Sequence, residues 1–337
     1  MAAGVGLLAS VLVVNWNGRA LLERCLPALA AQTLDDFEVV VVDNGSTDGS
    51  AELIERLCPG AVVVRAPTNL GFARGNNLGL PRCRGRYVAL LNNDCVAEPS
   101  WLERAVAAAE ASGSGMVATQ QLRAHRPETI DSAGITLDRA AIAWDRGGGA
   151  SADRAIHAPL FGPSGGAALY RRELLDDVGF FEGALEMYYE DVDLAWRARL
   201  RGWRCAEAAD ARVLHLGSAS AGRNSARKRF LLGRNKLWVA ARCYPSERYL
   251  AAVIAYDVMA LAGYVIGAPG HAVGADARRA AIAGRLAALR GLGPRLAERR
   301  AIQSQRTAAV DDVLDAMAPI EPPWRLRTRF RHLPEGR

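Results

Sequence analysis

The sequence predicts an α/β protein built on a doubly wound, parallel sheet. Four short apolar runs, of the kind found in strands covered on both faces, lie at residues 7–14, 37–42, 61–65 and 87–91. The segments between them space their apolar residues as amphipathic helices do, most clearly at residues 19–32. Strands that alternate with helices at this rhythm form parallel sheets with helices on both faces.

The rest of the chain continues this pattern and then departs from it. We expect a weakly patterned loop or hairpin excursion over residues 123–157 and a small-residue strand over 161–170. The further helices and strands expected are a helix at 101–112, a strand at 116–121, a helix at 194–201, a short strand at 212–216 and a helix at 230–243. Composition shifts after Pro245, so we divide the chain into residues 1–245 and a helical, basic extension at 246–337.

Composition is that of a soluble globular protein. Of 337 residues, half are hydrophobic and 23% are charged, and six scattered cysteines form no Cys-x-x-Cys pair. Neither a zinc site nor a disulfide framework is therefore expected. Residues 1–10 lack the basic start of a signal peptide, so we expect a cytoplasmic protein.

Positive charge is concentrated in one part of the chain. Residues 197–242 hold twelve Lys or Arg against two acids, whereas the whole chain has a net charge of +6. Such a stripe predicts an anionic partner, which could be a phosphorylated ligand, an acidic membrane or nucleic acid. Solvated helix faces explain residues 197–204 well, but they explain the Gly- and Ser-rich residues 217–229 poorly.

Polar side chains follow several predicted strands where each strand ends. Because ligands bind at the carboxyl edge of an open α/β sheet, we expect these side chains to converge on a site. One carboxylate with neighbouring amides suits a hard cation that takes its remaining ligands from water and phosphate. The simpler alternative for residues 92–94 is a polar turn. The residues concerned are Asn15, Asn17, Asp43, Asn92, Asn93 and Asp94.

Two later features could join this site. The acids Glu190, Asp191 and Asp193 open a predicted helix, where one or two acids would be enough for capping and helix-dipole stabilisation. His215 lies on a late strand, where an isolated histidine is more often a core residue with its hydrogen bonds satisfied.

Seven motifs, in this order, resemble the inverting family-2 glycosyltransferases, and the nearest pattern is the bacterial rhamnosyltransferase group. The resemblance spans about residues 7–245 and implies a GT-A-type nucleotide-sugar-binding fold. The motifs are Val-Val-Asn-Trp-Asn-Gly (13–18), Val-Val-Asp-Asn-Gly-Ser-Thr-Asp-Gly-Ser (41–50), Asn-Leu-Gly-Phe-Ala-Arg-Gly-Asn-Asn (69–77), Leu-Leu-Asn-Asn-Asp (90–94), Gly-Gly-Ala-Ala-Leu-Tyr-Arg-Arg (165–172), Tyr-Glu-Asp-Val-Asp-Leu (189–194) and His-Leu-Gly-Ser (215–218).

The resemblance also implies roles for residues at the site. Asp191 matches the general base, and Asp94 and His215 match ligands of Mg²⁺ or Mn²⁺ at the diphosphate. Asn92 stands where the family's motif has its first Asp, so fewer negative charges would hold the cation here. Donor binding falls to Asn15, Asn17, Asp43, Asn69, Arg74, Asn76, Asn92 and Asn93, diphosphate binding to Arg223 and Arg227, and the acceptor side or its support to Glu190, Gly165 and Gly166.

The expected activity is transfer of a sugar from a nucleoside-diphosphate donor to a hydroxyl of a glycan or lipid-linked acceptor in cell-surface polysaccharide synthesis. L-rhamnose from dTDP-rhamnose is the expected sugar, and another UDP or dTDP sugar, such as galactofuranose, is the alternative. A nucleotidyltransferase would need a Gly-rich, Lys-containing loop after the first strand, and residues 15–18 do not provide one. A non-catalytic, membrane-associated nucleotide-sugar-binding module is the remaining alternative, and nucleic acid is not an expected partner.

Residues 249–266 are almost entirely apolar but include Asp257 near their middle. A carboxylate at a bilayer centre costs about 2.5–3.5 kcal/mol, so a membrane span is not expected. The segment either packs on the transferase domain or lies in a membrane interface. With the arginines that follow it and the basic residues 325–332, we expect peripheral binding to the anionic inner face of the cytoplasmic membrane.

Overall fold

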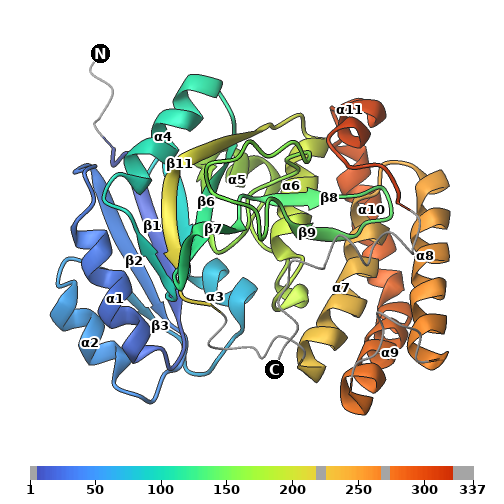
Figure 1. Cartoon of the computed structure of the whole chain (residues 1–337), viewed down its shortest axis with the longest axis horizontal. Helices are drawn as coiled ribbons and strands as arrows, with labels where there is room; N and C mark the ends of the chain where they lie inside the picture. The colour runs from blue at the N-terminus through green and yellow to red at the C-terminus, as the bar shows by residue number, and fades with distance from the viewer. Residues whose placement is uncertain (1–5, 218–224, 267–273, 322–337) are drawn as a thin grey trace.

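The computed structural model describes residues 6–217, 225–266 and 274–321 (Figure 1). The strands are β1 (Ala9–Asn15), β2 (Phe37–Asp43), β3 (Val62–Arg65), β4 (Tyr87–Leu91), β5 (Cys95–Ala97), β6 (Met116–Arg123), β7 (Arg126–Ser132), β8 (Ile135–Leu137), β9 (Ala143–Asp145), β10 (Ala167–Arg171) and β11 (Cys205–His215). The helices are α1 (Arg19–Ala30), α2 (Ser50–Leu57), α3 (Phe72–Gly79), α4 (Trp101–Ser112), α5 (Arg172–Val178), α6 (Glu190–Leu200), α7 (Ala226–Cys243), α8 (Glu247–Ile266), α9 (Ala275–Arg290), α10 (Leu292–Ser304) and α11 (Val310–Asp315), with short 3-10 turns at Leu80–Arg82 and Gly183–Leu185.

The predicted α/β sheet is confirmed, but it is mixed rather than parallel. Its strands follow the order β3-β2-β1-β4-β10-β6-β11-β5, with β7 added beside β6. The first four run parallel, as predicted. Strand β10 runs antiparallel to both of its neighbours, β4 and β6. A parallel neighbour needs a crossover connection, usually a helix, whereas the chain between β6 and β10 contains the strands β7, β8 and β9.

Register brings the polar strand ends to one edge of the sheet. Asn15 is the register partner of Asp43, and Leu12 of β1 pairs with Leu90 of β4. The residues that follow Leu91 therefore emerge beside those that follow Asn15. At the far side of the sheet, His215 ends β11 opposite Cys95 of β5. Four strands thus deliver their ends to a common edge.

Several element bounds differ from those predicted. Helix α6 begins at Glu190 rather than near residue 194, so the acidic run is its first turn. Strand β11 begins at Cys205, with a bulge between Ala208 and Arg212 that the apolar pattern did not reveal. Strand β10 spans only Ala167–Arg171, because residues 161–166 form one isolated bridge, at Gly162, and a turn instead of a strand.

Each face of the sheet carries its own hydrophobic core. Helices α1, α2 and α4 cover one face, where Leu26 and Trp101 are fully buried. Helices α3, α5, α6 and α7 cover the other, around Tyr170 and Trp196. The division at residue 245 stays a prediction, but residues on both sides of it share the second core, because Met317 and Val313 belong to the same buried cluster. Figure 1 shows α7–α10 gathered at one side of the sheet.

Candidate active site

The ends of β1 and β4 are joined by side-chain amides. The Asn93 Nδ2 donates to Asn15 Oδ1 over 2.7 Å, and Asn15 Nδ2 donates to Ser46 Oγ over 3.3 Å. Asn17, at a positive φ of 48°, accepts the backbone N–H of Thr47 on its Oδ1. The predicted polar residues that follow these two strands therefore lie together.

The turn after β2 is held by Asp43 and by a residue outside the predicted set. Asp43 is buried and accepts the backbone N–H of Ser46. Asn44, also buried, donates to Asn69 Oδ1 over 3.1 Å and accepts the backbone N–H of Leu70. Asn44 thus fastens the loop that carries Asn69 to the end of β2, a role for which its place in a turn motif gave no signal.

Two predicted donor residues of α3 are engaged within the protein. Arg74 is exposed, and its Nε donates to the carbonyl of Gly183 over 3.1 Å. Asn76 is buried, and its Nδ2 donates to the carbonyl of Phe72 one turn earlier in the helix. Arg74 thereby links α3 to the turn that precedes α6.

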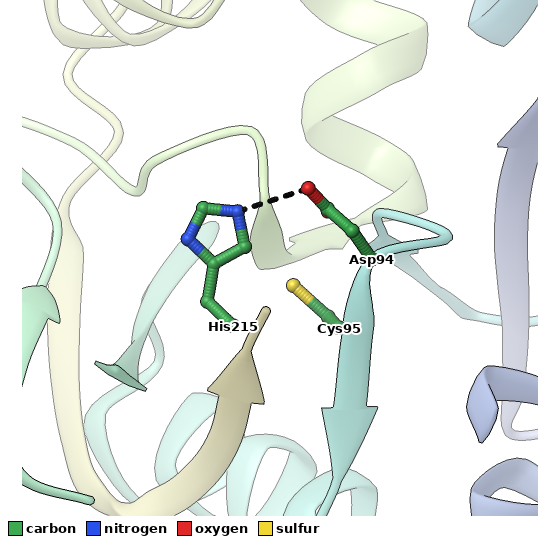
Figure 2. A group of neighbouring side chains, drawn as sticks. All are labelled: Asp94, Cys95 and His215. Carbon is green, nitrogen blue, oxygen red and sulfur yellow. Dashed lines mark ion pairs between the residues drawn. The ribbon is translucent and has the colours of Figure 1, made fainter. Parts of the chain in front are cut away.

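Asp94 and His215 face each other across the edge, as Figure 2 shows. His215 Nε2 lies 3.2 Å from Asp94 Oδ2, and the backbone N–H of Leu216 donates to the carbonyl of Asp94. The histidine is therefore not an isolated core residue. Burial alone would lower the pKa of His215, but hydrogen bonds with Asp131 and Asp94 outweigh it and raise that pKa to about 10.

Among the described residues, Asp94, Cys95 and His215 place potential ligand atoms within 4.8 Å of one another. Burial and the charge of Asp94 raise the pKa of the Cys95 thiol well above its usual range, and its Sγ points to the carbonyl of Gly166 at 3.7 Å. The thiol therefore stays protonated. Asp94 Oδ1 is buried and has no hydrogen-bond partner within the described part of the chain. An orphaned carboxylate oxygen beside an imidazole is a donor set that fits a divalent cation.

Gly165 and Gly166 connect this edge to Asp191. The backbone N–H of Gly165 donates to Asp191 Oδ2 over 3.0 Å, and the carbonyl of Gly166 accepts the backbone N–H of Asn92 over 2.8 Å. A Cβ on Gly166 would lie 2.6 Å from Gln121 Oε1, so a larger residue there would displace the end of that side chain. Two adjacent glycines thus place a carboxylate next to the end of β4.

The three acids at the start of α6 have different environments. Asp191 is half-buried. Burial raises its pKa, and this effect outweighs the hydrogen bonds from the N–H groups of Gly165 and Val192, which lower the pKa. Glu190 is buried, and burial together with the neighbouring Asp191 raises its pKa well above the usual range. Asp193 is fully buried and bonds to Arg197 at 2.8 Å. Asp193 is therefore structural, and of the three acids only Asp191 combines access with a raised pKa.

The turn before α6 is strained and is braced by α7. Glu186, Tyr188 and Tyr189 all have positive φ, a conformation that costs about 1–3 kcal/mol for such residues. The fully buried Asn235 directs its Nδ2 to the carbonyls of Leu185, Met187 and Tyr188 at 2.8–2.9 Å. Asn235 could not be predicted from the sequence, because one amide inside a basic helix gives no sign of what it contacts.

The predicted diphosphate arginines are only partly described. Arg223 lies outside the described residues. Arg227, exposed at the start of α7, lies 3.3 Å from Glu186, which also pairs with Arg234 at 3.0 Å. The basic helix α7 therefore approaches the site through the turn that precedes α6.

The known proteins that this chain resembles include glycosyltransferases. Residues 10–179 match the family model described as glycosyl transferase family 2. An uncharacterized glycosyltransferase of Nostoc sp. is 33% identical over 178 residues, 50% of this chain and 52% of that protein. The O-antigen biosynthesis protein RfbC of Myxococcus xanthus is 28% identical over 63% of this chain and 17% of its own length. The chain thus spans about half, or less, of these relatives.

A solved structure shares the fold. GalNAc-T7 with UDP, GalNAc and Mn²⁺ superposes with a TM-score of 0.65 and 14% identity, covering 99% of this chain and 60% of that one. A likeness at this identity shows the fold, which is GT-A. The family model covers residues 10–179, which is half of the chain. The chain therefore belongs to glycosyl transferase family 2.

Proposed function

We propose that the protein is an inverting glycosyltransferase that moves a sugar from a nucleoside-diphosphate donor to an acceptor hydroxyl. One observation supports this most: Asp94, with an orphaned buried oxygen, faces His215 on the sheet edge that also holds the Gly165 contact to Asp191. A cation site, a nucleotide edge and a carboxylate of raised pKa are the parts that such a transfer needs.

Asp191 is the proposed general base. An acceptor hydroxyl must lose its proton as it attacks the anomeric carbon, and a carboxylate within hydrogen-bond reach can take it. A raised pKa makes Asp191 a stronger base than an ordinary aspartate. Attack by the hydroxyl from the face opposite the leaving diphosphate inverts the anomeric centre in one step. Glu190 and Gly165 then support this carboxylate.

The chain's own groups bind the donor around this step. Asn15, Asn17 and Asp43 line the proposed pocket for a pyrimidine base, with Asn69 and Arg74 beside it. Asp94 and His215 would hold Mg²⁺ or Mn²⁺, which supplies positive charge to the departing nucleoside diphosphate when bound. GalNAc-T7, a structural neighbour, contains Mn²⁺ and UDP.

Arg227 is the proposed diphosphate ligand among the described residues. Its exposed pair with Glu186 is a weak one by nature, so an incoming diphosphate can replace the carboxylate at little cost. Arg223 is proposed for the same role on the ground of the family resemblance alone.

For the transferred sugar we propose L-rhamnose from dTDP-rhamnose, and for the pathway, cell-surface polysaccharide synthesis. The motif pattern and the O-antigen relative support this choice. Release of nucleoside diphosphate from a panel of activated sugars, with Mn²⁺, with Mg²⁺ and with EDTA, tests it. Release confined to dTDP-rhamnose and abolished by EDTA is expected. Preference for UDP-galactofuranose would replace the sugar, and no release from any donor would favour a binding protein.

Helix α8 supports a second proposal, namely that this part of the molecule rests on an anionic lipid surface. Among the described residues, no helix has both the length and the apolarity of a membrane span. Beyond the exposed Glu247 in its first turn, the exposed side chains described on α8 are apolar: Ile254 and Val258 are each 59% exposed and Ile266 is 76% exposed. The helix turns its one central charge inward instead, where Asp257 pairs with Arg285 at 2.9 Å.

An ordinary surface helix turns its charged side chains outward and its apolar ones inward, and α8 beyond its first turn does the reverse. Exposed cations lie on the neighbouring α9, at Arg279 and Arg290. Each basic residue near an anionic surface contributes about 1 kcal/mol, in addition to the burial of apolar side chains.

Sedimentation with phosphatidylglycerol vesicles at low and high salt tests the lipid proposal. We expect binding at low salt, loss of most of it in Ile254→Ser/Val258→Ser, and no change in a control, Leu78→Ser, on α3. Equal binding by the α8 variant would refute the proposal. Concentration-dependent dimers without vesicle binding would assign the α8 face to a second copy of the chain.

A further inference from the structure

Both ring nitrogens of His215 are engaged, and by different carboxylates. Its Nε2 lies 3.2 Å from Asp94, on the side proposed for the cation. Its Nδ1 lies 2.6 Å from Asp131 Oδ2, which is the shorter of the two contacts. Asp131 comes from a segment in which the sequence indicated only a loop or hairpin, and no role in the site was expected for it.

The fold fixes Asp131 through three adjacent strands. In the sheet, His215 of β11 is the register partner of Arg123 in β6, and β7 lies on the other side of β6. Asp131 of β7 reaches across, and its other oxygen, Oδ1, accepts Arg123 Nε over 3.2 Å. Burial alone would raise the pKa of Asp131, but the contacts with His215 and Arg123 lower it, so the residue is a carboxylate. The imidazole therefore has an anionic acceptor held in place behind it.

We propose that Asp131 is a positioning residue that keeps a proton on Nδ1 of His215 when a bound cation displaces the proton from Nε2, so that Nε2 can ligate the cation beside Asp94. The proposal rests on the function proposed above. In metal sites, a ligating histidine usually donates its second N–H to a carboxylate or carbonyl, which fixes the ring's tautomer and orientation and makes the ligand more basic. Asp131, His215 and Asp94 have this arrangement.

Asp131 also adds to the negative charge near the proposed cation. The motif at the end of β4 is Asn92-Asn93-Asp94, so it brings one carboxylate to the cation. Asp131 supplies a second negative charge, separated from the cation by one imidazole ring. We infer that this charge compensates for the acid that the motif lacks at Asn92.

A purely structural role makes a different prediction. If the Asp131–Arg123 pair only fastens β7 to β6, replacing Asp131 lowers thermal stability and leaves cation affinity unchanged. A positioning role changes the cation affinity and the tautomer of His215. Asp131→Asn can still accept a hydrogen bond but has no charge, whereas Asp131→Ala removes the acceptor.

The test measures Mn²⁺ binding in the presence of UDP or dTDP, with electron paramagnetic resonance used to quantify the free Mn²⁺. We expect Asp131→Asn and Asp131→Ala to bind Mn²⁺ about 10–100-fold more weakly than wild type. The matched control is Glu128→Gln, an exposed acid on the same strand, which should bind as wild type does. A thermal melt of each variant identifies any that is unfolded, and the near-isosteric Asp131→Asn then decides.

A second readout is independent of affinity. The chain has five histidines, so ¹⁵N-histidine labelling gives a simple spectrum in which His215→Gln identifies the signal. With Mg²⁺ and nucleotide bound, wild type should show His215 protonated at Nδ1 only, and Asp131→Ala should lose this single tautomer. Unchanged affinity and tautomer in the Asp131 variants would overturn this inference alone, whereas wild type that binds no Mn²⁺ with nucleotide would overturn the proposed function as well.

Discussion

The substitution Asp191→Asn tests the proposed chemistry at its centre. It keeps the shape of the side chain but removes a base, which is worth about 10²–10⁴-fold in rate, or about 2.7–5.5 kcal/mol in the activation free energy. We expect the turnover number to fall by that factor, and the affinity for the nucleotide donor to stay within a few-fold of wild type.

The structure also sets the expected cost to stability. Both oxygens of Asp191 accept backbone N–H groups, from Gly165 at 3.0 Å and from Val192 at 2.8 Å. An amide keeps one of these bonds and turns an N–H toward the other donor, which costs about 1–3 kcal/mol. Removing a negative charge beside the buried Glu190 acts in the opposite direction. We therefore expect the melting temperature to change by a few degrees only.

The assay is single-turnover transfer, with donor binding measured by calorimetry on the same preparation. Glu190→Gln is the matched comparison, because the pKa of Glu190 is raised well above its usual range and the residue is neutral over more of the pH scale. It should keep at least a tenth of the wild-type rate. If Asp191→Asn keeps more than about a hundredth of the rate, Asp191 is not the base. A larger loss in Glu190→Gln would transfer that role to Glu190.

Three further predictions concern pH, the cation and the C-terminal helices. Because burial raises the pKa of Asp191, kcat/KM should fall as pH drops through a value above the ordinary aspartate pKa of about 3.9, and an acid limb at or below 3.9 would contradict this. Asp94→Ala and His215→Ala should each weaken the binding of nucleoside diphosphate in the presence of Mn²⁺ but not in its absence. Calorimetry that shows the wild-type dependence on Mn²⁺ in both variants would contradict a cation site at this edge. Asp257→Ala leaves the buried Lys236 and the largely buried Arg285 without their carboxylate, so it should lower the free energy of unfolding by about 3–5 kcal/mol. The exposed Asp276→Ala should cost almost nothing, and denaturant melts that show equal losses would refute this reasoning.

The sequence predicted the first half of the fold well, because local signals and tertiary packing agree there. The apolar run at 87–91 is β4 without change, and the helix at 101–112 is α4. A buried parallel strand must be apolar along its whole length, and this makes it visible in one sequence. The direction of β10 was not visible, because an apolar run does not reveal how the chain enters the sheet.

Some residues of the candidate site could be predicted from the sequence and others could not. Residues at the ends of apolar strands, such as Asn15, Asp43 and Asp94, could be predicted because position alone makes them candidates. Asp131 and Asn235 could not. Asp131 lies on a polar edge strand with weak alternation, and Asn235 lies in a helix whose pattern is basic. Their partners are 84 residues away for Asp131 and about 50 for Asn235, so only the folded chain reveals them.

The central claim is that a nucleotide-bound divalent cation sits between Asp94 and His215. A crystal structure with dTDP and Mn²⁺, with anomalous data at the manganese edge, tests this most directly. We expect one anomalous peak within about 2.3 Å of an Asp94 carboxylate oxygen and of His215 Nε2, with the diphosphate on its open side. A peak away from both side chains, or nucleotide bound at the sheet edge with no peak, would contradict it.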